Sequence, residues 1–147
     1  MKNLPDILPD FRSSGVFRAP DDSPIKELER LAKQYKYKFF LLDGAEIRDK
    51  ERFLNHAAAV LSFPDYFGNN WDAFEDCLTD MSWHETDGFL IVYDHFEILA
   101  QHAPDEFKIA LEILRDSVEF WRERKRPFFV LLRGRGKQGL ELPSVAF

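Results

Sequence analysis

The sequence predicts an α/β protein: a three-stranded parallel sheet packed with helices. Three almost wholly apolar runs, at residues 37–42, 89–93 and 127–132, have the length and the aromatic and aliphatic content of buried strands. Segments with helical periodicity separate these runs. Parallel strands need long crossover connections, so strands that alternate with helices favour a parallel sheet covered by helices.

The connecting segments carry helix start and stop signals. Asp49 and Asp94 are each placed to cap the helix that follows, and Pro64 ends the first of these helices. Residues 65–70 have the composition of a turn-rich loop. From these signals, helices are expected over about 49–63, 71–81, 95–101 and 104–125.

The first 36 residues are expected to form an N-terminal extension with an extra helix. Residues 1–20 contain prolines and a glycine without a clean period, which predicts an irregular arm. Ser23 followed by Pro24 is typical of an N-cap and a first helical position. Apolar residues then recur at helical spacing as far as Tyr35.

Length and composition favour one soluble domain. A chain of 147 residues with 45% hydrophobic content is long enough to bury a core. The single cysteine, Cys77, excludes an internal disulfide and a multi-cysteine zinc site, and we expect a buried, inert thiol. No signal peptide or membrane-spanning run is visible, so a cytoplasmic protein without membrane contact is expected.

Charge is strongly segregated along the chain. No lysine or arginine occurs between Arg52 and Lys108, and this stretch carries 11 carboxylates. The net charge of −6 therefore divides into −11 in the middle and +5 on the flanks. An acidic patch attracts a basic partner and speeds its arrival, whereas the acidic balance argues against nucleic acid as the partner.

The segment 71–81 concentrates this acidity on one helix face. Its apolar side is a core face, and the opposite side carries Asp72, Glu75, Asp76, Thr79 and Asp80. The three aspartates are four residues apart, and each like-charged pair costs about 0.2–0.5 kcal/mol. Three interpretations stay open. The face is simply solvated, it pairs internally with a basic cluster, or a basic partner supplies the missing charge. That basic cluster is Arg122, Arg124, Lys125, Arg126, Arg133, Arg135 and Lys137.

An enzymatic function has little support in the sequence. Asp72 and Asp76 could act as paired carboxylates or hold a cation with Glu75, but one helix turn cannot supply the six or more oxygens that a hard cation takes. The four histidines lack metal-ligand spacing, and no phosphate-binding loop or nucleophile elbow is present. We therefore expect no catalytic residue, no metal and no cofactor.

At the run 63–80, which reads FPDYFGNNWDAFEDCLTD, the chain resembles the barstar family. These proteins are small intracellular inhibitors of secreted bacterial ribonucleases of the barnase type. The loop with Tyr66 and Gly68, the following Asn70 and Asp72, and the ending Asp-Cys-Leu-Thr carry the resemblance. It extends over about 39–132 and implies a three-stranded parallel sheet packed with helices, without enzymatic activity.

The resemblance also implies residue roles. Asp76 would mimic a substrate phosphate in the ribonuclease active site, Asp72 would be the second helix aspartate, and Tyr66 would pack on the nuclease. The remaining partner-binding positions are Gly68, Asn70, Trp71, Ala73, Glu75, Thr79, Asp80 and, on the last long helix, Asp116.

The chain departs from the family pattern at several positions. Glu75 replaces an aromatic residue and Asp80 a glycine of the best-known member, and both changes add negative charge. Met81 replaces an aromatic residue that faces the partner, and Trp83 could take over the role of that aromatic residue. Residues 1–36 and 134–147 have no counterpart in the minimal family domain, which leaves 37–133 as the barstar-like domain and 134–147 as a tail.

Together these observations predict a ribonuclease inhibitor or antitoxin, monomeric when free. Its partner would be a basic extracellular-type ribonuclease or ribonuclease toxin, bound through 66–80. The alternative is a module with the same fold that binds another basic protein.

Overall fold

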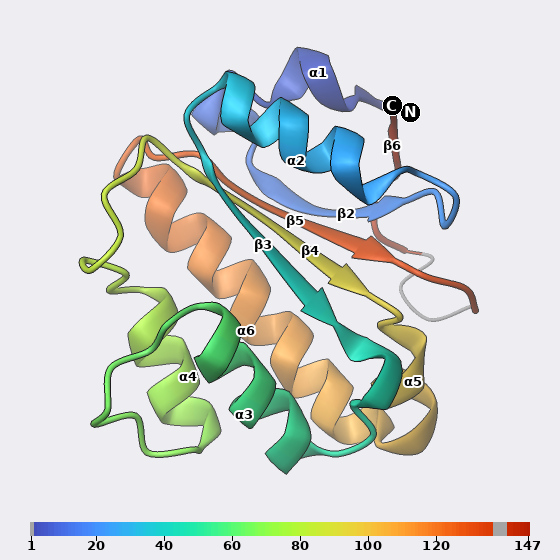
Figure 1. Ribbon diagram of the computed structural model, residues 1–147, viewed down its shortest axis with the longest axis vertical. Helices are drawn as coiled ribbons and strands as arrows, with labels where there is room; N and C mark the ends of the chain where they lie inside the picture. The colour runs from blue at the N-terminus through green and yellow to red at the C-terminus, as the bar shows by residue number, and fades with distance from the viewer. Residues whose placement is uncertain (1, 137–140) are drawn as a thin grey trace.

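A four-stranded, all-parallel sheet forms the centre of the protein (Figure 1). The computed structural model describes residues 2–136 and 141–147. The strands lie in the order β2-β5-β4-β3, and their bounds are β2 (Gly15–Ala19), β3 (Lys38–Asp43), β4 (Phe89–Asp94) and β5 (Phe128–Arg133). The predicted α/β class and the three predicted strands are confirmed.

The two central strands are buried on both faces. Every residue of β4 is buried, as are the first five of β5. Alternate side chains point to opposite faces, so Ile91 joins one hydrophobic cluster and Val92 the other. This double burial explains why both strands read as continuous apolar runs in the sequence.

Helices supply the cover for both faces (Figure 1). One face is covered by α1 (Leu4–Ile7) and α2 (Ile25–Gln34). The other is covered by α3 (Lys50–Val60), α4 (Trp71–Leu78) and α6 (Pro104–Glu123), with α5 (Glu97–His102) following β4. The described residues also form two 3-10 turns, η1 (Phe11–Ser13) and η2 (Gly44–Glu46).

Within residues 2–136 and 141–147, no helix has the length and apolarity needed to cross a membrane.

The N-terminal arm is the main correction to the predicted fold. Residues 15–19 were expected to be irregular but form β2, which makes four strands instead of three. Val16 packs into one hydrophobic cluster, and Phe17 and Ala19 into the other. Five residues with a glycine at the start give too short a pattern to reveal a strand, and pairing with the edge of β5 decides the conformation.

Two predicted helix starts also differ from the structure. The N-cap of α2 is Pro24 without a side-chain bond, because the hydroxyl of Ser23 donates instead to the carbonyl of Pro20. Asp94 ends β4 and pairs with Arg133 instead of capping a helix. By contrast, Asp49 caps α3 as predicted, since its carboxylate accepts from the backbone N–H of Arg52 at 2.8 Å.

The two ends of the chain meet beside β2 (Figure 1). The two-residue strand β1 (Lys2–Asn3) pairs in parallel with β6 (Val145–Ala146). Next to it, the backbone N–H of Arg18 donates to the carbonyl of Pro143 at 2.8 Å. The C-terminal segment thus partly covers the outer edge of β2, which would otherwise present unpaired backbone groups.

Truncating the extension's main anchor is expected to destabilise the whole protein. Phe17 is 4% exposed and stacks on Phe129 with ring centroids 6.4 Å apart. Phe17→Ala should lower the free energy of unfolding in urea by about 3–5 kcal/mol through the lost burial and the cavity. Phe147→Ala, at a side chain 45% exposed, is the control and should change it by less than about 0.5 kcal/mol. A Phe17→Ala protein as stable as the wild type would show that β2 is not part of the cooperative unit.

Candidate protein-docking surface

The loop before α4 is built by local hydrogen bonds. The backbone N–H of Phe67 donates to the carbonyl of Pro64 at 3.0 Å, and the side-chain amide of Asn70 donates to the carbonyl of Gly68 at 3.3 Å. The carbonyl oxygen of the same amide accepts from the backbone N–H of Ala73 at 2.8 Å and so caps α4. Asn70 therefore fixes both the loop and the start of the helix.

The buried face of α4 is anchored by aromatic side chains. Phe74, Cys77 and Leu78 are buried, and Phe74 meets Phe53 edge to face at 5.3 Å. The indole N–H of Trp121 donates to the carbonyl of Leu78 at 2.8 Å. These contacts hold one side of the helix against α6 and leave the other side to solvent.

A second indole ties the first turn of α4 to α6. The indole N–H of Trp71 donates to the carboxylate of Glu106 at 2.7 Å. Trp71 is half-buried and makes this internal contact, and its predicted contact with a partner stays a prediction. Glu106 was not predicted, because it lies 35 residues further along the chain and no local pattern links the two.

Predicted site residues gather on the opposite side of α4 and in its loop. Tyr66 is 70% exposed, and the three aspartates at 72, 76 and 80 are exposed. The other members vary: Gly68 and Asn70 are exposed, whereas Trp71, Ala73, Glu75 and Thr79 are half-buried. We call this set, from Tyr66 to Asp80, the acidic surface.

The helix is shorter than predicted and ends at Leu78. The hydroxyl of Thr79 turns back to the carbonyl of Glu75 at 2.9 Å, and Met81 takes a left-handed conformation with its side chain buried. Asp80 therefore lies just beyond the helix, on the turn that follows it. At that end its negative charge meets the negative pole of the helix dipole.

Asp116 lies on α6 and not on α4 or its flanking segments. It is exposed on α6 and lines a hollow together with Gly15 and Val16 of β2. The other predicted positions all belong to α4 or to the segments directly before and after it. The role of Asp116 as a peripheral contact stays a prediction.

The acidic surface carries no ion pair to a lysine or arginine within residues 2–136 and 141–147. Some members of the basic cluster pair with other carboxylates. Arg133 pairs with Asp94 at 2.8 Å, and Arg122 pairs with Glu119. Lys137 lies outside the described residues. Internal pairing, one of the three interpretations of the acidic face, is thus not found in the described part of the chain.

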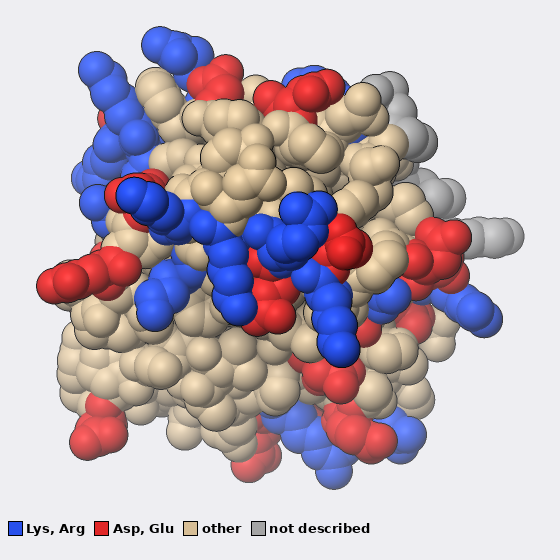
Figure 2. Space-filling view, turned by 45° about the horizontal axis from the view of Figure 1, so that its top comes forward, with Lys and Arg blue, Asp and Glu red and all other residues tan. Residues whose placement is uncertain are grey.

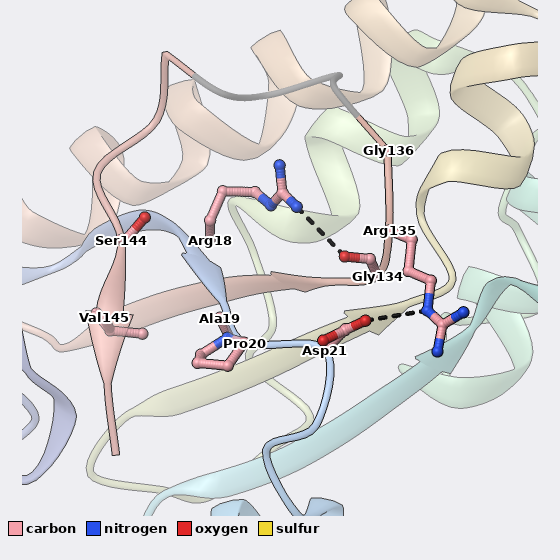
Figure 3. Close-up of a pocket in the computed structure, with 9 residues that line it drawn as sticks. All are labelled: Arg18, Ala19, Pro20, Asp21, Gly134, Arg135, Gly136, Ser144 and Val145. Atoms are coloured by element: carbon pink, nitrogen blue, oxygen red, sulfur yellow. Dashed lines mark hydrogen bonds and ion pairs between the residues drawn. The ribbon is translucent and has the colours of Figure 1, made fainter.

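Two other regions of the molecule differ from the acidic surface in how their charges are distributed. Figure 2 brings the α1 and α2 side forward and shows positive and negative side chains intermingled there. On α2, Arg30 pairs with Glu27 at 2.9 Å. In the hollow of Figure 3, Arg135 pairs with Asp21 at 3.0 Å, and Arg18 donates to the carbonyl of Gly134 at 3.2 Å. By contrast, the acidic surface contains no lysine or arginine.

Cys77 lies beneath the acidic surface. Burial raises the pKa of its thiol, and the nearby carboxylates of Asp76 and Asp80 raise it further. The thiolate, which is the reactive form, is therefore disfavoured. This environment agrees with the buried, inert thiol expected from the sequence.

A family model described as Barstar (barnase inhibitor) matches residues 37–133. The chain belongs to the barstar family. Members of this family are inhibitors and not enzymes. The matched segment contains β3, β4, β5 and α3 to α6, and with them the acidic surface. Comparison with curated proteins gives no match.

A solved structure outside this family has a similar fold. The ORC2 protein of Aeropyrum pernix, solved as ADPNP–ADP complexes, superposes with a TM-score of 0.53 at 15% sequence identity. The likeness covers 82% of this chain but 35% of that chain. At this identity it shows the fold alone and indicates no shared function.

Trp83 packs partly against the hydrophobic core. Its indole N–H donates to the carbonyl of Leu61 at 3.1 Å, and its ring meets Phe63 edge to face at 6.1 Å. The side chain stays half-buried, so one side of it remains accessible. Met81, at the position where the barstar family has a partner-facing aromatic, is buried.

Removing an unpaired charge from the acidic surface is expected to stabilise the free protein. Asp80→Asn eliminates repulsion with Asp76 and with the end of the helix dipole, so the free energy of unfolding should rise by about 0.3–1 kcal/mol at low salt. Urea unfolding at low and high salt measures this gain, which should shrink as salt screens the charges.

Asp72→Asn is the matched control for this charge removal. Asp72 lies in the first turn of α4, where the dipole favours a negative charge, so its removal should give a smaller gain or a loss. A loss of stability in Asp80→Asn would show that the like charges do not strain the helix.

Proposed function

We propose that this protein is a cytoplasmic inhibitor of a basic ribonuclease, acting as an antitoxin to a bacterial ribonuclease toxin. The observation that carries the proposal is the acidic surface, whose exposed carboxylates have no cationic partner in the described part of the chain. The acidic surface lies within the segment that matches the Barstar (barnase inhibitor) model, which supports a role in inhibiting a ribonuclease. The free protein would be a monomer, with no cofactor and no nucleic acid bound.

Asp76 is the residue proposed to enter the ribonuclease active site. Its exposed carboxylate lies near the middle of the surface, between Asp72 and Asp80. A nuclease holds RNA phosphates with arginine, lysine and histidine side chains, and a carboxylate presents the same anionic oxygens to them. Charge-assisted hydrogen bonds to such groups are stronger than neutral ones, and the inhibitor would occupy the site by mimicking its substrate.

Tyr66 supplies the apolar contact beside this charged centre. It is the most exposed large hydrophobic side chain in the described residues, and an exposed tyrosine offers rigid contact area with a hydrogen-bonding tip. Gly68 and Asn70 shape the loop that presents it. Asp116 would add a peripheral contact from α6.

Replacing Asp76 should abolish most of the inhibition. Asp76→Ala removes the proposed phosphate mimic and leaves the cations of the nuclease unpaired, so the dissociation constant should rise by more than about tenfold, equivalent to about 1.4 kcal/mol. The measurement is inhibition of RNA cleavage by a panel of barnase-type ribonucleases. Asp22→Ala is the control, because Asp22 is exposed in the turn before α2 and should leave inhibition unchanged. If no nuclease is inhibited by the wild type, or Asp76→Ala inhibits equally well, the proposal is wrong for that panel.

Association with the nuclease should depend strongly on salt. Complementary charges steer the two proteins together, and this attraction is screened over about 10 Å at 0.1 M salt. The association rate in stopped flow should fall by at least about tenfold as ionic strength rises from low to high values. An insensitive rate would point to a mainly apolar interface instead.

A basic protein without nuclease activity is the second candidate partner. Glu75 and Asp80 add charge at positions where the best-known family member is aromatic or glycine, which favours a partner with additional cations. Capture from the source cell with wild-type and Asp76→Ala proteins, followed by a ribonuclease assay of the bound fraction, separates the two candidates. A partner that binds through Asp76 and cleaves no RNA would favour the second.

A further inference from the structure

Three metal-ligating side chains meet where β3 and β4 end. The Nδ1 atom of His95 lies 3.3 Å from an oxygen of Asp43 and 3.5 Å from an oxygen of Asp94. One donor atom from each residue lies within 4.8 Å of the other two. Ligands of open parallel sheets bind just outside the carboxyl ends of the strands, which is where these three residues are. None of them belongs to the acidic surface.

The sheet itself brings the donors together. Asp43 and Asp94 are register partners at the ends of adjacent parallel strands. Gly44 allows the chain after β3 to lie close against β4, because a Cβ at this position would be 2.7 Å from the carbonyl oxygen of Asp94. His95 directly follows Asp94 in the chain and adopts a left-handed conformation with φ of 53°. The arrangement follows from strand pairing, so it would be present before any ligand binds.

Both carboxylates are also held by a second contact, and the backbone of His95 is held as well. Arg133 binds one oxygen of Asp94 at 2.8 Å, and the other oxygen faces His95. The carboxylate of Asp43 accepts from the backbone N–H of Ala45 at 3.1 Å. The backbone N–H of His95 donates to the carbonyl of Arg133 at 2.8 Å. The contacts to the two carboxylates are of the kind that orients metal ligands behind a metal site.

Two of the three donor separations, those from His95 Nδ1, are close to what a small tetrahedral cation requires. Ligand atoms about 2.0–2.1 Å from zinc in a tetrahedron are about 3.3–3.4 Å apart, close to the two distances from His95 Nδ1. We propose that Asp43, Asp94 and His95 form a binding site for a divalent transition-metal ion of the zinc type. Three protein ligands leave a fourth position for water, as in open zinc sites.

The donor set also selects the class of ion. Magnesium and calcium take six or more oxygen ligands, whereas an imidazole nitrogen with two carboxylates suits zinc and its neighbours. The lining of an adjoining hollow of about 340 Å³ includes Asp94, His95, Glu97 and Arg135. This hollow gives the ion and its water a route to solvent.

Zinc titration of the full-length protein tests the site. Competition with a chromophoric chelator should show one zinc ion bound per chain, and His95→Gln and Asp43→Asn should each weaken binding by at least about tenfold. Both side chains are about half exposed, 48% for His95 and 58% for Asp43, so neither change should prevent folding. Asparagine at 43 keeps the acceptor for Ala45. Thermal unfolding of each variant checks that the fold is retained.

His102→Gln is the matched control, because His102 is an exposed histidine on α5 outside the cluster. It should bind zinc like the wild type, and an excess of magnesium should not compete. In NMR spectra, added zinc should shift the His95 ring resonances before those of the other histidines. If the wild type binds no zinc, or binds it as well after both substitutions as before, the three residues form only an ion-paired cluster and the proposal is overturned.

This site is independent of the proposed ribonuclease inhibition. Asp43→Asn and His95→Gln should therefore inhibit a target nuclease as the wild type does. Loss of zinc binding with inhibition intact would support both proposals.

Discussion

A parallel sheet with apolar side chains on both faces must be covered on both sides, and this constraint organises the protein. Because β4 and β5 are buried throughout almost their whole length, each face needs its own layer of helices. Helices α3, α4 and α6 cover one face, and the N-terminal extension with α1 and α2 covers the other. The extension lies outside the segment matched by the barstar family, yet it buries Leu90 and Val92 at the centre of the sheet.

The same packing gives the acidic surface its definite shape. Phe74 and Leu78 anchor the buried face of helix α4, and the hydrogen bond from Trp71 to Glu106 holds its start. Its carboxylates repel one another, but the apolar contacts stabilise the helix enough to hold them in place. A helix that is formed before binding loses little backbone entropy when it binds, which suits a surface that must meet a fixed set of cations.

Sequence patterns located most of the fold and the acidic surface, and they failed where contacts between distant segments decide the structure. The strands β4 and β5 are evident because burial on both faces makes them apolar runs, and β3 is evident from its aromatic and aliphatic residues although it is only partly buried. Strand β2 is not evident, because its five residues acquire strand conformation from pairing with β5. Ser23 and Asp94 have the residue types of helix caps. The hydroxyl of Ser23 instead donates to a nearby carbonyl, and the carboxylate of Asp94 accepts from Arg133.

Three properties follow from the sequence alone: the α/β class, the amphipathic segment that forms α4, and the excess of carboxylates on the outer side of that segment. These properties depend on residue type and on spacing along one segment, which the sequence contains directly. Three other features depend on the folded arrangement: the fourth strand, the partner of Trp71, and the meeting of Asp43 with Asp94 and His95. Each of these joins residues more than 30 positions apart, and their proximity arises from strand order and helix packing.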